Sequence, residues 1–397
     1  MLSFDSLDRG NVRMVQNVCH MNRTFKVAAL LVAFAALGIA ERTLERVAGA
    51  QTKAPSYQVD PFWPKLPKQW ILGQVAGLDI DANDHVWIIQ RPWSLNTDEV
   101  AKNPEAECCH EAPPVMEFDA AGNYIQGWGG EAPRYEWPKD EHALHIDYKG
   151  NVWISSAGGP RLRERTENQI LKFTKSGKFL MQIGHRGQSK GSLDTNNFNN
   201  AADIYVYPKT NEVFVADGYV NRRVIVLDAD TGKFKRMWGA YGKAPDDSVP
   251  RTRAYDPVPQ QFNLVHGLVI SRDGIVYVAD RNNNRVQAFT LDGKFLKEAF
   301  VAKEIPMVGF GTANSVALSG DEDQRFLYVC EGHQQRIRVL DRQTLQEVPN
   351  SMFGHVGPYP GQFLGLHIIT SDAKGNIYTG DGRDGRIQKF VFTGLAR

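Results

Sequence analysis

The sequence has little cysteine, little net charge and no long hydrophobic run. Four cysteines among 397 residues cannot build the dense disulfide scaffold of a small secreted domain. The 46 basic and 45 acidic residues leave a net charge of +1, so no basic surface for nucleic acid is indicated. No apolar run reaches the ~20 residues of a membrane-spanning helix. With 42% hydrophobic residues, the composition predicts a soluble globular chain with a large core.

The longest apolar run lies near the N-terminus, at Val27–Ala40, and has 14 residues. Two basic residues precede it, and the small residues Ala48–Ala50 follow it. Positive, apolar and small segments in this order are typical of a secretory signal peptide. We therefore predict a leader over residues 1–50, beginning at Met1 or Met21, and a secreted or periplasmic protein. The alternative is an uncleaved membrane anchor.

Beyond the leader the chain keeps Cys108, Cys109 and Cys330. An exported protein can form disulfides, because its compartment is oxidising. The adjacent pair predicts either a bond between Cys108 and Cys109 or a bond from one of them to Cys330. Unpaired thiols are the alternative, since a bond between neighbouring residues has unusual geometry.

Residues 51–397 contain six copies of one repeat, and one copy reads HGLVISRDGIVYVADRNNNRVQAF from His266. Each copy has an alternating apolar strand, a D-x-x-G type turn and further β-rich strands. Four antiparallel strands repeated at this spacing are typical of a propeller blade. We predict an all-β fold, with one six-bladed β-propeller domain over 51–397; a seven-bladed ring and an open solenoid are the alternatives. The six copies begin at Ala76, His142, Ala202, His266, Asn314 and His367.

The two ends of the repeat region are both incomplete. The last repeat ends at Phe392 without a fourth strand, and Ser56–Asp60 is a strand-like segment that belongs to no repeat. We predict that Ser56–Asp60 completes the last blade and closes the ring, which removes exposed strand edges.

Histidine begins alternate repeats, at His142, His266 and His367. The first strand of every blade lines the central channel, so equivalent positions converge on one axis. Three imidazoles at one depth suit Zn²⁺, with a fourth position open to water or substrate. The alternative is three channel histidines without a ligand. His145, three positions after His142, is expected to point to the other face of its strand.

Arginine recurs at a second repeat position. Arg91 lies 15 residues after the start of its repeat, and Arg281 lies 15 residues after the start of its own. This position ends the second strand, on the ring face where the first strand begins, because the two strands are antiparallel. Guanidinium groups bind carboxylates in pairs of hydrogen bonds, so an anionic substrate is indicated. Ion pairs between blades are the alternative role.

Tyr219 occupies the same corner of the third repeat, in the sequence DGYVNRRV. A phenol beside a dication ionises more easily and can act as a general base. An aromatic plug in the mouth of the channel is the alternative.

These motifs resemble a known family. The repeats are similar to NHL repeats, and GQVAGLDID, HALHID, VADGYVNRRV and the repeat from His266 resemble peptidyl-α-hydroxyglycine α-amidating lyase, over about Gly73 to Phe392. The resemblance implies a six-bladed propeller with a zinc ion held by three histidines. The matching zinc ligands are His142, His266 and His367, and the matching active-site tyrosine and arginines are Tyr219, Arg91 and Arg281.

The chain also departs from the family pattern. The Asp that helps the family to bind a structural calcium is Ile368 here, and a Met near the third histidine is Gly365. Val220 and Val278 stand where the family has disulfide partners. The resemblance therefore extends to zinc and does not support calcium.

The activity that the resemblance implies is cleavage of the C–N bond of a peptidyl- or N-acyl-α-hydroxyglycine, which yields an amide and glyoxylate. Tyr219 would accept the hydroxyl proton, and Arg91, with Arg281, would neutralise the substrate carboxylate. An exported binding scaffold is the alternative, with insertions 92–113 and 240–261 as contact loops for a protein partner. A lactonase-type propeller hydrolase usually has acidic metal ligands, and the first repeat position has none.

Overall fold

The computed structural model describes residues 53–96, 99–100, 109–157, 166–251, 255, 257–305 and 311–396. The leader predicted over residues 1–50 lies outside these ranges. The described chain from Ala54 onward forms one compact unit. Within these ranges, no helix combines the length and the apolar character needed to cross a membrane.

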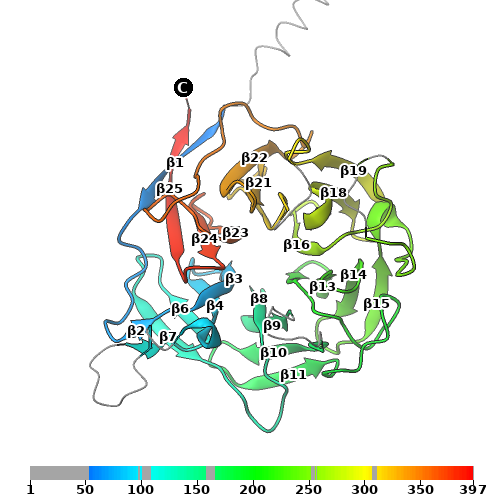
Figure 1. Ribbon diagram of the computed structural model, residues 1–397, viewed down its shortest axis with the longest axis horizontal. Helices are drawn as coiled ribbons and strands as arrows, with labels where there is room; N and C mark the ends of the chain where they lie inside the picture. Colours follow the sequence, from blue (N-terminus) through cyan, green and yellow to red (C-terminus); the bar gives the residue numbers. More distant parts are fainter. Residues whose placement is uncertain are drawn as a thin grey trace, which may run out of the picture. The chain divides into compact units, whose positions relative to one another are not determined.

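Six antiparallel sheets surround a central channel, with the first strand of each repeat innermost (Figure 1). Blade one contains β3 (Gln74–Ile80), β4 (Val86–Arg91), β6 (Val115–Phe118) and β7 (Tyr124–Trp128). Blade two contains β8 (Glu141–Ile146), β9 (Asn151–Ser156), β10 (Ile170–Thr174) and β11 (Phe179–Ile183). Blade three contains β12 (Asp203–Tyr207), β13 (Glu212–Asp217), β14 (Arg223–Asp228) and β15 (Phe234–Trp238).

The second half of the chain continues the ring. Blade four contains β16 (Val265–Ile270), β17 (Ile275–Asp280), β18 (Arg285–Thr290) and β19 (Phe295–Phe300). Blade five contains β20 (Val316–Leu318), β21 (Phe326–Glu331) and β22 (Arg336–Asp341). Blade six contains β23 (Leu366–Ser371), β24 (Ile377–Asp381), β25 (Ile387–Leu395) and β1 (Pro55–Asp60). The shorter elements are β2 (Trp70–Ile71), β5 (His110–Glu111) and the 3₁₀ helices η1 (Pro92–Ser94), η2 (Ala240–Gly242) and η3 (Arg281–Asn283).

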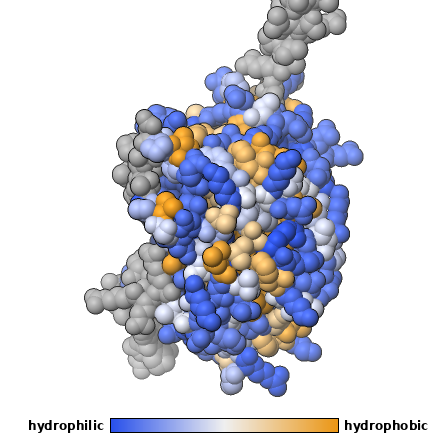
Figure 2. All heavy atoms as spheres, turned by 90° about the vertical axis from the view of Figure 1, so that its right-hand side faces the viewer, coloured by the Kyte–Doolittle hydropathy of each residue, from blue (hydrophilic) through white to orange (hydrophobic). Residues whose placement is uncertain are grey.

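The ring closes as predicted, through the N-terminal strand. Strand β1 pairs antiparallel with β25, and Gln58 lies opposite Val391. The hydroxyl groups of Tyr57 and Tyr328 are 2.5 Å apart, which ties β1 to blade five as well. The six-bladed prediction is confirmed, and the seven-bladed and open alternatives are wrong. The side of the ring at β15 and β19 is mostly hydrophilic, with small apolar groups (Figure 2).

Blade five is the irregular one, and its repeat is the weakest in the sequence. In place of a fourth strand it has single bridges, from Ile337 to Phe353 and from Leu340 to Glu347. Pro349 lies between the two bridged residues of this segment and cannot donate to a ladder. The interruption is thus a local effect of the sequence.

Two polar motifs repeat with the blades and explain the recurrent Asp and Arg of the sequence. At the first turn of blade two, Asp147 accepts hydrogen bonds from the backbone of Asn151 and from the Trp153 indole. At the next corner, the arginine that opens the third strand pairs with the acid that ends the second, as Arg285 does with Asp280 at 2.8 Å. Both groups are fully buried, so each charge depends on the other.

The hydrophobic core is divided among the junctions between blades. Six clusters of buried apolar side chains each contain residues of two neighbouring blades, and one of these clusters joins blade six to blade one. Trp153 and Phe198, for example, lie in the cluster between blades two and three. Each blade is thus stabilised by both of its neighbours, which makes ring closure part of the core.

The structure describes two of the three cysteines for which disulfide bonds were predicted. Cys109 is disulfide-bonded, and Cys330 is free and buried. The predicted alternative of a disulfide bond to Cys330 is therefore wrong. Cys108 lies outside the described residues, as do parts of the insertions 92–113 and 240–261.

Candidate metal and active site

Backbone bulges mark the positions that face the channel. The ladder between the first two strands skips Ala76 in blade one, His266 in blade four and His367 in blade six. In blade two the skipped residues include His142. A bulge re-aims its side chain out of the regular alternation, and bulges are common beside active sites. The sequence register identified these positions, and the bulges explain how their side chains reach the channel.

The three predicted histidines meet in the channel. Their ring centroids are 4.9 to 5.1 Å apart, and their ligand nitrogens lie within 4.8 Å of one another. All three side chains are buried: His142 and His266 are each 1% exposed and His367 is 8% exposed. The three blades that supply them alternate around the ring, as the repeat register predicts.

Each histidine contacts the carbonyl of the equivalent residue in the next blade. Nδ1 of His142 is 2.7 Å from the Ala202 oxygen, and Nδ1 of His266 is 2.7 Å from the Asn314 oxygen. A carbonyl only accepts hydrogen bonds, so Nδ1 is the protonated nitrogen in both rings. The third histidine has a weaker contact of this kind. The Ala76 backbone raises the pKa of His367, but His367 Nδ1 makes no hydrogen bond of proper geometry. The Nε2 lone pairs of His142 and His266 are thus left for the channel.

The site keeps these imidazoles neutral. Burial lowers the pKa of His142 and of His266 well below the usual value, and neighbouring imidazoles and arginines lower it further. For His367, burial together with Arg91 and Arg281 lowers the pKa to about 3. Neutral imidazole is the form of histidine that binds metal ions.

Tyr219 enters the same cluster from the corner of blade three. Its hydroxyl is 2.9 Å from Nε2 of His142 and 3.1 Å from Nε2 of His266. The corner is pressed against β16, because a Cβ on Gly218 would come within 2.0 Å of the Val265 carbonyl oxygen. Burial raises the pKa of Tyr219, while Arg281 and Arg91 lower it, Arg281 also through a hydrogen bond.

Both predicted arginines lie within electrostatic reach of the cluster. Arg281, in η3, is 8% exposed and acts on the pKa of His266 and of Tyr219. Arg91, at the end of β4, donates from Nε to the Glu141 carbonyl at 2.8 Å, and Nε is 2.7 Å from the Asp140 carboxylate. Arg91 therefore joins blade one to blade two, which is the alternative role considered for it, and its role toward an anionic substrate stays a prediction.

An acidic and aromatic group beside Arg91, formed by Glu141, Trp93 and Trp137, was not predicted from the sequence. Glu141 accepts hydrogen bonds from the indoles of Trp93 and Trp137, at 3.1 and 2.9 Å. Burial raises the pKa of Glu141, and these hydrogen bonds oppose the rise. The signal available in the sequence was the acidic pair Asp140-Glu141 directly before the first histidine.

The donor set fits a cation better than it fits a closed hydrogen-bond network. Tyr219 has one hydroxyl proton and can donate to only one of the two Nε2 atoms that it contacts. Two lone pairs then face each other without a proton between them. A metal ion with three imidazole ligands relieves that contact and leaves one position open.

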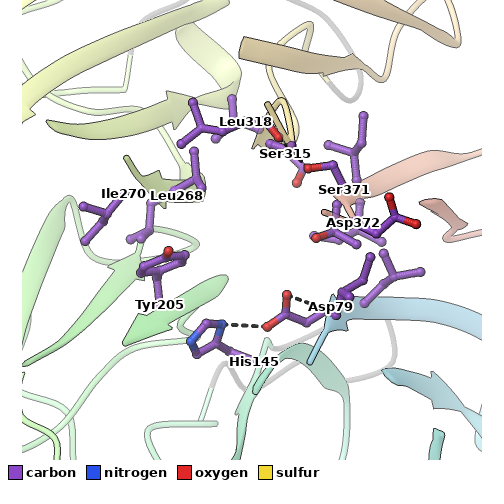
Figure 3. A pocket seen from close by; sticks show the side chains of 18 of the residues that line it. Asp79, His145, Tyr205, Leu268, Ile270, Ser315, Leu318, Ser371 and Asp372 are labelled. Carbon is purple, nitrogen blue, oxygen red and sulfur yellow. Dashed lines mark hydrogen bonds and ion pairs between the residues drawn. The ribbon is translucent and has the colours of Figure 1, made fainter. Parts of the chain in front are cut away.

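Two other histidines, His145 and His85, lie outside the three-histidine centre. His145 does not point away from the channel: Nδ1 is 2.8 Å from Asp79, and both residues line a cavity at the other ends of the first strands (Figure 3). The bulge at His142 shifts the alternation of β8, which explains why the prediction was wrong. His85 follows the turn that precedes β4, with Nδ1 2.7 Å from Glu117.

The group formed by Asp81, His85 and Glu117 could also hold a metal by spacing alone. The Lys175 ammonium already lies 2.5 Å from Asp81, and Gln126 donates to Glu117 at 2.6 Å. A cation and hydrogen bonds thus occupy the acidic groups, so this cluster is an inter-blade contact.

The closed six-bladed ring and the buried three-histidine centre define the class of this protein: a β-propeller with a candidate metal site in its channel. The NHL repeat model matches residues 262–289. Rattus norvegicus peptidylglycine alpha-amidating monooxygenase is 31% identical over 345 residues, which cover 83% of this chain and 31% of that protein. The chain thus spans about a third of the length of this relative.

Two further relatives are named differently. A probable peptidyl-alpha-hydroxyglycine alpha-amidating lyase of Caenorhabditis elegans is 27% identical over 55% of this chain and 56% of its own. Homo sapiens NHL repeat-containing protein 3 is 24% identical over 86% of each chain. A Bacteroides thetaiotaomicron protein of unknown function shares the fold, with a TM-score of 0.54, 14% identity and coverage of 85% of this chain and 76% of its own. The chain thus has a six-bladed propeller fold and resembles both NHL-repeat proteins and the α-amidating lyases.

Proposed function

We propose that the protein is a zinc-dependent lyase that cleaves the C–N bond of a peptidyl- or N-acyl-α-hydroxyglycine. The observation that supports this most directly is the convergence of three neutral imidazoles, one phenol and two guanidinium groups in a single buried site. Relatives with a lyase name support the same reaction.

His142, His266 and His367 would hold the metal through Nε2, and the Ala202 and Asn314 carbonyls would keep Nδ1 of His142 and of His266 protonated. When bound there, Zn²⁺ would supply Lewis acidity at the substrate hydroxyl and lower its pKa. Three imidazoles with one open position are a ligand set that zinc enzymes use. Calcium has no place in this proposal.

Arg281 and Arg91 would bind the substrate carboxylate and orient the α-carbon toward the histidines. Tyr219 would ionise beside a bound dication and then accept the hydroxyl proton, since its oxygen is in contact with two of the imidazoles. The oxygen electron pair then forms the aldehyde C=O of glyoxylate as the C–N bond breaks. The amide nitrogen takes the proton that Tyr219 accepted from the hydroxyl, and no oxidant is required because the carbon is already at the aldehyde level.

We also propose that the protein is exported and acts on a small anionic or peptide substrate outside the cytoplasm. The disulfide at Cys109 supports an oxidising compartment. The leader that would direct export lies outside the described residues.

Metal analysis and a glyoxylate-release assay on α-hydroxyhippurate test the lyase. We expect about one zinc per chain and release of glyoxylate, with both lost in His266→Ala. A non-catalytic binding propeller is the second candidate, because a propeller fold does not by itself determine function. Stoichiometric zinc without glyoxylate release from any N-acyl-α-hydroxyglycine would support that candidate and overturn the lyase.

A further inference from the structure

The channel has a second polar chamber, at the opposite ends of the first strands from the three histidines. It is a cavity of about 320 Å³ lined by residues of all six first strands. Asp79 and His145 lie beside each other, Tyr205, Leu268 and Ile270 follow along the neighbouring side, and Leu318 lies across from Asp79 (Figure 3). None of these side chains has a part in the reaction proposed above.

The chamber is strongly acidic. Five aspartates line it, against one arginine, Arg272. The Arg272 guanidinium is held at the edge by the carbonyls of Asp321 and Glu322, each at 2.9 Å. Of the acids, Asp81 is paired with Lys175, whereas Asp203 has no ion pair of this kind among the described residues.

His145 does not neutralise this charge. Its Nδ1 donates to Asp79, and its Nε2 accepts the Val206 N–H at 3.0 Å. Burial opposes the imidazolium and Asp79 favours it, with a net rise of the His145 pKa. A proton on Nε2 would nevertheless face the Val206 N–H, so the geometry retains a neutral imidazole beside a charged Asp79.

Asp203 keeps capacity for a ligand. Its two oxygens accept the backbone N–H groups of Ile204 and Leu268, at 2.9 Å each. A carboxylate has about four acceptor sites, so roughly one on each oxygen is left for the cavity. Burial raises the pKa of Asp203 to about 7, and a nearby cation would reverse that shift.

Tyr205 supplies a second, uncharged polar contact. Its ring packs on His145, with centroids 4.9 Å apart, and its remaining accessible surface lines the cavity. Burial raises its pKa to a value at which the phenol stays protonated. The Tyr205 ring can also face a cation, while the apolar side chains of Leu268, Ile270 and Leu318 suit an alkyl chain.

The spacing of these groups argues against a single metal ion. Two groups of described residues bring metal-binding atoms within 4.8 Å of one another, and neither includes Asp79 or Asp203. A molecular cation can contact separated carboxylates, whereas one metal ion requires its ligands at about 2.0 to 2.6 Å.

We propose that this chamber is a binding site for a small organic cation, an alkylammonium ion whose ammonium group pairs with Asp203 and whose chain packs on Leu268 and Leu318. The site is separate from the three-histidine centre and does not depend on the lyase activity.

Calorimetric titration of the purified protein with 1,4-diaminobutane tests the site. We expect one molecule bound per chain, no binding of the neutral 1,4-butanediol, and an affinity at least about tenfold lower in Asp203→Asn. Tyr205→Phe, which removes only the hydroxyl, should weaken binding less and serves if Asp203→Asn does not fold. Asp230→Asn, at an exposed turn of blade three, is the matched control and should bind the diamine normally.

Four results would overturn the proposal. The first is no binding to the unaltered protein at millimolar diamine. The second is an affinity for the diamine in Asp203→Asn and in Tyr205→Phe that equals the affinity of the unaltered protein. The third is Ca²⁺ binding that depends on Asp203 and that the diamine does not displace. Binding that persists in His266→Ala places the diamine away from the histidines, and its loss there would contradict the assignment.

Discussion

At the residue scale, the Tyr219 hydroxyl has a role that its ring does not share. The oxygen touches two imidazoles, whereas the ring packs edge-on against His142 and His266 with centroids 5.2 and 5.5 Å apart. Packing and proton transfer can therefore be separated by removing one atom.

Tyr219→Phe should retain zinc and the melting temperature and should lower kcat for α-hydroxyhippurate about 100-fold or more, the usual effect of losing a general base. Zinc content and steady-state kinetics measure this. Tyr148→Phe, at an exposed position, should leave kcat unchanged. Full activity in Tyr219→Phe with zinc bound would make Tyr219 a packing residue.

Asp203 predicts a pH dependence of stability. Its folded pKa of about 7 lies above the unfolded value near 3.9, so between these limits the folded state binds the extra proton. Stability from this group is therefore present below pH 4 and is lost as pH rises toward 7. Asp203→Asn removes that contribution, so the difference in unfolding free energy between the two proteins should shift in favour of the variant from pH 4 to pH 7. Denaturant titrations at several pH values measure this, and a pH-independent difference would show that the pKa of Asp203 is the same in the folded and unfolded states.

At the element scale, the first strands position the histidines through bulges, and the corners position Tyr219 and the arginines. Gly218 and Gly382 occupy equivalent corners in blades three and six. A Cβ at 218 would meet the Val265 backbone at 2.0 Å, whereas a Cβ at 382 would lie 3.3 Å from the His367 side chain.

Gly218→Ala should therefore destabilise the protein by about 1 to 3 kcal/mol, the usual range for a forced steric clash, because the backbone of β16 cannot yield cheaply. It should also lower kcat, since the Tyr219 corner must move. Gly382→Ala should cost less stability. Guanidinium denaturation compares the two variants, and equal costs would mean that the corner of blade three relaxes freely.

At the scale of the whole molecule, stability depends on closure of the ring. Strand β1 covers the edge of β25, and Tyr57 stacks on Phe353 with ring centroids 4.8 Å apart. Without β1, blade six loses a strand and presents an unpaired edge.

Deletion of residues through Asp60 should lower the melting temperature sharply and promote aggregation, whereas deletion of residues 1–52 should leave the propeller folded. Circular dichroism and size-exclusion chromatography measure both. A monomeric, equally stable protein after deletion through Asp60 would show that β1 is dispensable for closure.

The sequence alone determined the repeat and, through it, much of the architecture. Six units with the same strand and turn pattern place equivalent residues on one axis, so the meeting of His142, His266 and His367 follows from chain periodicity. The closing strand could be predicted because an incomplete last blade needs a partner for its edge. Local pattern is sufficient where the same constraint recurs in every blade.

The tertiary structure decided what happens between blades. The contact of His145 with Asp79, the ion pair that ties Arg91 to Asp140, and the chamber at Asp203 each join residues from different repeats. No periodicity in one strand specifies such contacts, because they depend on how neighbouring sheets twist and how closely their inner edges approach. The repeat therefore predicted which residues face the axis, and packing between the blades determined their partners.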